Sequence, residues 1–170
     1  MKISIIGPSA GGKSVLARKL CEKFSLPMLG LDRLWFRHGG TNANTTEQKQ
    51  EINKKIRADI EQFVISNDNW VTEGTYSKIQ LFIANKADTV ILIKRPFLSR
   101  LFSHVLRVIK GKDRHPEVTK WQDLCFARTI FRRWRNGENK SIEELVGQFK
   151  GKTVVLKSFQ DIDRYFDSLL

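Results

Sequence analysis

The stretch "IIGPSAGGKS" (residues 5–14) decides the fold. Four residues separate its first glycine from the glycine that precedes lysine and serine, which is the spacing of a phosphate-binding P-loop. The run "KISIIG" (residues 2–7) reads as a short apolar strand, and "KSVLARKLCEKF" (residues 13–24) repeats apolar residues at helical spacing. A strand, a glycine-rich turn and a helix are the context that the motif requires. The sequence therefore predicts a nucleotide-binding loop rather than an exposed turn with a solvated lysine.

The loop itself identifies the first candidate site residues. Its glycines allow a tight turn in which successive backbone N–H groups and a helix N-terminus point at one anion. Lys13 is expected to reach the β- and γ-phosphates of ATP, and the Ser14 hydroxyl is expected to ligate Mg²⁺. The other expected nucleotide contacts are Gly7, Ser9, Ala10, Gly11, Gly12 and Val15. A dinucleotide-binding fold is disfavoured, because GxGxxG is absent.

Strand-like and helix-like segments alternate along the whole chain. Further strands are predicted in residues 26–32, 69–76, 88–94 and 152–158, and further helices around residues 52–64, 96–109, 121–135 and 161–170. In the helix that Pro96 opens, we expect one apolar face to point inward, made by Leu98, Leu101, Phe102, Val105 and Ile109. Five strands with helical crossovers indicate an α/β fold: a P-loop NTPase with a five-stranded parallel sheet and helices on both faces. At 170 residues, the chain is expected to form one domain.

Two acids follow predicted strands. Asp32 and Glu73 would lie beside the phosphate loop if their strands neighbour the first one, because ligands of such sheets bind at the carboxyl ends of the strands. Carboxylates there hold Mg²⁺ or accept a proton from an attacking hydroxyl. We assign Glu73 to the metal and Asp32 to catalysis and to the phosphate acceptor. The alternatives are a turn role for Glu73 and an N-cap or an ion pair with Arg33 for Asp32.

Four stretches in this order and spacing resemble a known family. They are "IIGPSAGGKS", "LDRLWF", "WVTEGTY" and "ADTVILIKRP", and they are similar to the bacterial DNA topology modulation proteins, a FlaR-related group of adenylate-kinase-like P-loop proteins. The resemblance covers roughly residues 1–110 and implies an adenylate-kinase-like fold and ATP binding. The family usually has Asp-Gly-Asn-Tyr where this chain has Glu-Gly-Thr-Tyr (residues 73–76), and often an acid where Lys94 stands. The resemblance does not indicate which molecule accepts the phosphate.

Positive charge is concentrated in one segment. Residues 94–135 contain twelve Lys or Arg and three acids, which is nine of the net twelve positive charges. Arg128 and Arg132 lie one turn apart beside an apolar edge that includes Phe131 and Trp134 and is expected to face the core. In kinases of the adenylate-kinase type, lid arginines close over the transferring phosphoryl group. We therefore expect a basic helical lid at about residues 96–136.

A second interpretation of this segment is a DNA- or RNA-binding surface. It ranks lower, because aromatic side chains at helical spacing are more often core than stacking platforms. For the acceptor, the expected contacts are Asp32, Arg33, Trp35, Tyr76 and Arg100.

Other compartments and chemistries find less support. Two cysteines without metal-ligand spacing and the lack of a secretory leader or an 18-residue apolar run suggest a cytoplasmic protein without a membrane partner. The three histidines form no hydrolase or zinc motif. The sequence thus predicts an ATP- and Mg²⁺-dependent kinase that acts on a nucleotide-like or other small acceptor. The alternative is a nucleotide-regulated nucleic-acid-binding protein, and the oligomeric state stays open.

Overall fold

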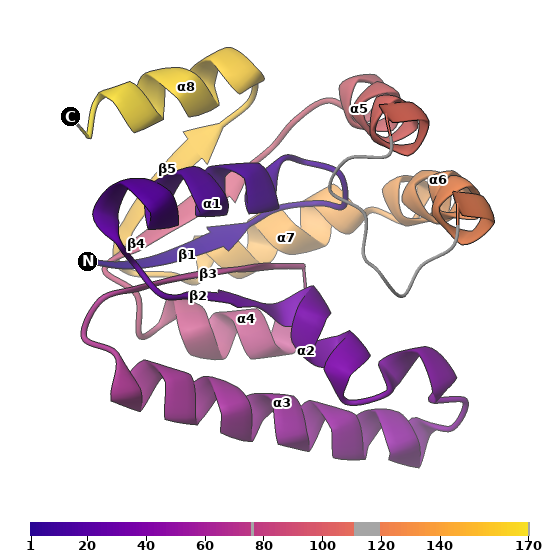
Figure 1. Cartoon of the computed structure of the whole chain (residues 1–170), viewed down its shortest axis with the longest axis horizontal. Helices are drawn as coiled ribbons and strands as arrows, with labels where there is room; N and C mark the ends of the chain where they lie inside the picture. Colours follow the sequence, from indigo (N-terminus) through magenta and orange to yellow (C-terminus); the bar gives the residue numbers. More distant parts are fainter. Residues whose placement is uncertain (76, 111–119, 170) are drawn as a thin grey trace.

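A five-stranded parallel sheet forms the centre of the molecule (Figure 1). The computed structural model describes residues 1–75, 77–110 and 120–169. Its strands are β1 (Lys2–Ile6), β2 (Met28–Gly30), β3 (Trp70–Gly74), β4 (Thr89–Ile93) and β5 (Lys152–Leu156), in the spatial order β2-β3-β1-β4-β5. Every neighbouring pair is parallel. The predicted fold class is confirmed.

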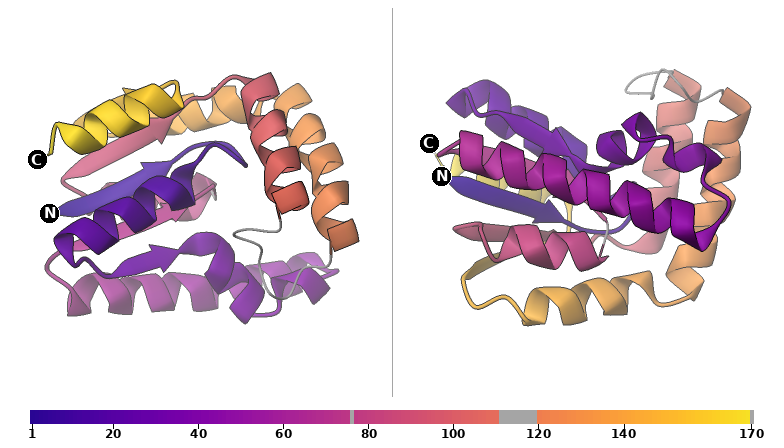
Figure 2. Two further views of the ribbon diagram at one scale, coloured as in Figure 1. Left: turned by 45° about the horizontal axis from the view of Figure 1, so that its top comes forward. Right: turned by 90° about the horizontal axis from the view of Figure 1, so that it is seen from below.

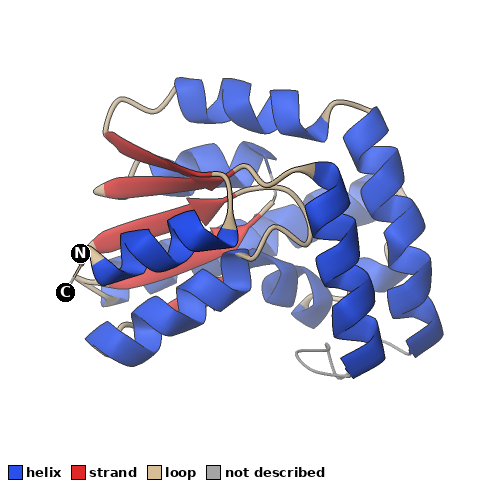
Figure 3. Cartoon of the chain, turned by 90° about the horizontal axis from the view of Figure 1, so that it is seen from above, coloured by secondary structure: helices blue, strands red, loops and turns tan. Residues whose placement is uncertain are grey.

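Helices cover both faces of this sheet (Figure 3). One face packs on α1 (Lys13–Phe24) and α8 (Phe159–Asp167), and the other on α4 (Ser77–Ala84) and α7 (Glu138–Gly147). The long α3 (Thr46–Ser66) packs on α2 (Leu31–Arg37), α4 and the β3 side of the sheet. A 3₁₀ turn (Gly40–Asn42) joins α2 to α3.

The core lies on the two faces of the central strand. Ile5 of β1 packs with Leu16 and Leu20 of α1, whereas Ile6 packs with Ile142 of α7 on the opposite side. Burial on both faces explains why β4 reads as an unbroken apolar run rather than as an alternating strand. All elements that carry the P-loop are therefore held by the main core.

The elements differ from the prediction in three places. Helices α4 and α7 were not singled out in the sequence. The second strand ends at Gly30, and Asp32 is the second residue of the helix that follows directly. The structural reason is that β2 is a three-residue edge strand, so the chain turns into α2 before the predicted end.

The pair of helices α5 (Phe97–Lys110) and α6 (Lys120–Arg135) lies beyond the carboxyl ends of the strands (Figure 2). The predicted inward face of α5 is wrong. Leu98, Phe102 and Ile109 are 74%, 65% and 74% exposed, while Arg100 and His104 are fully buried. The physical reason is that α5 does not cover the sheet. It turns its polar side toward the P-loop and α6, where Arg100 donates to the Ser9 carbonyl and the His104 ring packs near the Phe126 ring.

The predicted inward edge of α6 is wrong as well. Phe131 and Trp134 are 47% and 43% exposed, whereas Ile130 is fully buried. The two aromatic rings pack on Phe97 of α5, with the Trp134 and Phe97 rings stacked at 4.5 Å between centroids. They therefore join the two helices to each other, not to the core of the sheet.

Candidate functional site

The P-loop is built from backbone positions that exclude side chains. Gly7 directly follows β1, and a Cβ atom there would lie 2.5 Å from the carbonyl oxygen of Ile93 on β4. Gly12 adopts a left-handed conformation (φ +100°) at the N-cap of α1. The strand and the helix are thereby joined closely enough for the loop to turn back on itself, with the Gly11 N–H donating to the Pro8 carbonyl at 3.1 Å.

Lys13 and Ser9 are buried within this loop. The Lys13 ammonium donates to the Pro8 carbonyl at 3.0 Å, although only 6% of the residue is exposed. The Pro8 oxygen thus accepts from both Lys13 and Gly11, two donors that P-loops direct at phosphate. Val15, the last expected loop contact, is partly exposed at the first turn of α1.

Glu73 lies beside the loop because β3 is the direct neighbour of β1. It pairs in register with Ile5, is 6% exposed and receives a hydrogen bond from the Ser14 side chain. Burial raises the pKa of the Glu73 carboxyl above its ordinary value, against the opposing effect of the Lys13 ammonium. Its Oε2 atom is buried without a hydrogen-bond partner among the described residues. A buried carboxylate oxygen without a donor is a natural ligand for a cation.

Asp32 reaches the same edge by a different route. Its strand β2 neighbours β3 and not β1, so the proximity expected from neighbouring strands holds for Glu73 alone. The α2 helix nevertheless brings Asp32 and Arg33 near enough for their charges to act on the Glu73 carboxyl in opposite directions. The Trp35 ring packs against Gly40, where no side chain would fit. Tyr76 lies outside the described residues.

The arginines separate into two groups. Arg100 is fully buried and donates from Nη1 to the Ser9 carbonyl at 3.1 Å. Arg128 and Arg132 are exposed on α6. Arg133, which the sequence analysis did not select, donates from Nη1 to the Ser9 hydroxyl at 2.9 Å. The helical spacing that singled out Arg128 and Arg132 does not indicate that Arg133 reaches the loop.

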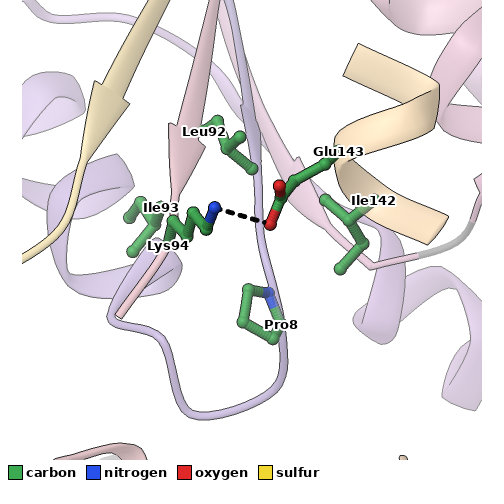
Figure 4. A pocket seen from close by; sticks show the side chains of 6 residues that line it. All are labelled: Pro8, Leu92, Ile93, Lys94, Ile142 and Glu143. Atoms are coloured by element: carbon green, nitrogen blue, oxygen red, sulfur yellow. Dashed lines mark ion pairs between the residues drawn. The ribbon is translucent and has the colours of Figure 1, made fainter. Parts of the chain in front are cut away.

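A further ion pair borders the loop on the α7 side. Lys94 follows β4 directly and contacts Glu143 of α7 at 2.9 Å (Figure 4). The two residues line a shallow depression together with Pro8, Leu92, Ile93 and Ile142 (Figure 4). Lys94 therefore links the sheet to α7, at a position where the resembling family often has an acid.

The described part of the chain contains neither a cluster of metal-binding side chains nor a membrane-spanning helix. In residues 1–75, 77–110 and 120–169, no three His, Cys, Asp or Glu side chains gather in a metal-binding group. A divalent ion at Ser14 and Glu73 would thus depend on oxygen ligands from phosphate and water, as Mg²⁺ commonly does. No helix within these ranges is long and apolar enough to cross a bilayer.

Known proteins resemble the chain in fold. No family model matches the sequence, and no curated protein matches it. Among solved structures, shikimate kinase from Acinetobacter baumannii in complex with shikimate superposes with a TM-score of 0.62 at 10% identity, over 98% of this chain and 89% of the other. Deoxyadenosine kinase from M. mycoides with bound dATP superposes with a TM-score of 0.60 at 15% identity, over 99% of both chains.

A putative kinase from Chloroflexus aurantiacus is also similar, with a TM-score of 0.55 at 13% identity over 99% of this chain and 96% of the other. At these identities the similarity establishes the fold alone, which is that of P-loop kinases. The resemblance to topology modulation proteins stays a prediction.

Proposed function

We propose that the protein is an ATP- and Mg²⁺-dependent phosphotransferase that moves the γ-phosphate of ATP to a small acceptor. The observation that carries the proposal is the meeting of Lys13, Ser14 and Glu73 at the carboxyl edge of a P-loop-kinase sheet. Lysine and serine on a glycine loop also serve other NTPases, so the shared fold with small-molecule kinases favours transfer to an acceptor over hydrolysis.

The loop residues fit a nucleoside triphosphate. Lys13 and Gly11 already donate to one oxygen atom, the Pro8 carbonyl, so they are oriented for a shared acceptor. A phosphate is a stronger acceptor than a neutral carbonyl because of its charge. We assign phosphate binding to Lys13 and to the loop residues Gly7, Ser9, Ala10, Gly11, Gly12 and Val15.

Glu73 and Ser14 fit a magnesium ion. The unpartnered Oε2 atom of Glu73 and the adjacent Ser14 hydroxyl are oxygen donors of the kind that Mg²⁺ prefers. When bound, the ion neutralises charge that develops on the transferring phosphate. Because burial raises the pKa of Glu73, its carboxyl retains a proton to higher pH than an exposed carboxyl does, and binding of the ion would release that proton.

The acceptor would lie on the α2 side of the site. Asp32 is close enough to influence Glu73, and its carboxylate could accept the proton of an attacking hydroxyl. Arg33 and Trp35 share its helix, and we retain them as acceptor contacts together with Tyr76. Arg100 binds the Ser9 carbonyl on the P-loop side, so we propose that it contacts the acceptor only at the phosphate that is transferred. For Arg128 and Arg132, which face solvent, we propose contact with the phosphoryl group after closure of the lid.

An acceptor-dependent ADP-release assay tests the proposal. The panel comprises nucleosides, nucleoside monophosphates and small hydroxy acids, each with ATP and Mg²⁺. ADP release that requires both an acceptor and Lys13 supports it. ATP hydrolysis that ignores every acceptor would favour a nucleotide-driven switch instead.

One observation favours nucleic-acid binding as the second candidate. The aromatic rings of Phe131 and Trp134 are partly exposed beside the exposed Arg128, Arg132 and Arg135, and not buried as the sequence suggested. Exposed rings among arginines are a feature of surfaces that bind single strands. One face of the Trp134 ring is stacked on Phe97, however, which limits its use as a platform. Affinity for single-stranded DNA and RNA at several salt concentrations tests this candidate.

A further inference from the structure

Two helices contact the P-loop at Ser9, and a third helix is joined to both of them by a carboxylate. Arg100 of α5 binds the Ser9 carbonyl, and Arg133 of α6 binds the Ser9 hydroxyl. Glu138, the first residue of α7, contacts both arginines: its Oε2 is 3.4 Å from Nη1 of Arg100, and its Oε1 is 4.0 Å from Nη1 of Arg133. The carboxylate of Glu138 thus bridges two arginines that both hold the phosphate loop.

This cluster has more positive than negative charge. Arg95 is 2% exposed and near enough to Arg100 that, in addition to burial, the charge of Arg100 lowers its pKa. In the described part of the chain, Glu138 is the one carboxylate in ion-pair contact with Arg95, Arg100 or Arg133. Glu138 is thus shared between two guanidinium groups, and Arg95 lies near one of them, so the excess of positive charge leaves room for a further or a stronger anion.

The hydrogen bonds of Arg100 are incomplete as well. Its Nε and Nη2 atoms are buried without an acceptor among the described residues. The contacts that Glu138 makes, at 3.4 and 4.0 Å, are also longer than the roughly 2.7–2.9 Å of well-formed guanidinium–carboxylate hydrogen bonds. A tetrahedral oxyanion with more acceptor oxygens would satisfy more of these donors than Glu138 does.

We propose that Glu138 is an internal counter-anion that occupies the place of a phosphate group between Arg100 and Arg133 until a bound polyphosphate displaces it. The inference rests on the proposed function, since it takes a polyphosphate to be the ligand of the loop. Glu138 is then a positioning residue: it holds both arginines against Ser9 in the free protein and opposes phosphate binding by competing for them.

The test uses the full chain and inorganic tripolyphosphate, so that neither an acceptor nor a metal ion is needed. In Glu138→Gln, calorimetric titration is expected to show about tenfold tighter binding than in the wild type, equivalent to about 1.4 kcal/mol. Glu144→Gln is the matched control, because Glu144 is an exposed residue of the same helix and the variant has the same net charge. Its affinity should stay within about twofold, because a distant exposed charge is largely screened by salt.

Thermal stability, as a second readout, distinguishes competition between Glu138 and phosphate from a purely structural role of Glu138. Glu138→Gln should melt at a lower temperature than the wild type without ligand and gain more on adding tripolyphosphate. In an Arg133→Gln background, the gain in affinity should shrink, because one of the contested arginines is gone. Should Glu138→Gln fail to fold, Glu138→Asp keeps the charge, withdraws it by one methylene and is expected to bind tripolyphosphate more tightly than the wild type.

Equal or weaker binding by a folded Glu138 variant would overturn the inference and make Glu138 a support of the site. Tighter binding by Glu138→Gln without ADP release from any acceptor would uphold the inference and contradict the kinase assignment. Acceptor-dependent ADP release without tighter binding by Glu138→Gln would uphold the kinase assignment and contradict the inference about Glu138. Absence of tripolyphosphate binding in every variant would contradict both.

Discussion

Substitution of Gly7 by alanine tests whether the close approach of the loop to β4 shapes the phosphate site. The added Cβ atom would lie 2.5 Å from the carbonyl oxygen of Ile93, about 0.9 Å short of the 3.4 Å at which ordinary van der Waals contact begins. The obstacle is backbone of a central strand and not the end of a flexible side chain. The loop, rather than β4, must therefore move.

The expected cost is that of overpacking a core position, about 1–3 kcal/mol. For a chain of this length, that corresponds to a fall in melting temperature of roughly 2–12 °C. Because the shift moves the first residue of the loop, the affinity for ATP should fall in the variant protein that remains folded. Differential scanning calorimetry and titration with a non-hydrolysable ATP analogue measure the two effects.

Gly147→Ala is the control for Gly7→Ala. Gly147 ends α7, and a Cβ atom there would have nothing within 4 Å. The melting temperature should stay the same or rise slightly, because alanine is the better helix former. A Gly7→Ala variant that melts and binds the analogue like the wild type would refute the loop geometry described here.

Three further predictions concern side chains of the site. Lys13→Met preserves much of the buried volume and removes a charge-assisted contact, so ATP affinity should fall by about tenfold or more in an equilibrium titration; wild-type affinity would contradict the P-loop assignment. Glu73→Gln should weaken the Mg²⁺ dependence of turnover more than it weakens nucleotide affinity. Without ligands, the variant should also be more stable than the wild type at pH 7, because the raised pKa of Glu73 makes its ionisation unfavourable to folding. In urea titrations across pH, this advantage should vanish below the ordinary glutamate pKa of 4.5. Replacement of both Arg128 and Arg132 by alanine should reduce turnover by roughly tenfold or more while ATP binding changes little, since those charges act in the closed state; loss of salt-dependent nucleic-acid binding with intact turnover would point to the second candidate function.

The strands and the loop were predictable because their signals are local. A buried parallel strand shows as an unbroken apolar run, and the P-loop spacing shows in ten residues. The neighbour relation of β1 and β3, which places Glu73 beside the loop, is not contained in either strand. It became visible only with the sheet order.

The helices beyond the sheet were harder to predict for a physical reason. The apolar arc of α5 is clear in the sequence, but periodicity shows which face is apolar and not which face meets the rest of the protein. Here the buried side carries Arg100 and His104, because the helix packs on the P-loop. Arg133 and Glu138 were missed for the same reason: Arg133 contacts Ser9 across 124 residues of sequence, and Glu138 contacts Arg100 across 38.

The proposed activity is transfer of phosphate from ATP to a small acceptor at the edge formed by the P-loop and Glu73. The most direct measurement is ADP release with ATP and Mg²⁺ across the acceptor panel, with the wild type and Lys13→Met side by side. We expect at least one acceptor to stimulate ADP release by the wild type, with the phosphorylated acceptor recovered in equal amount, and Lys13→Met to abolish both. ADP release that no acceptor changes, or that persists in Lys13→Met, would contradict it.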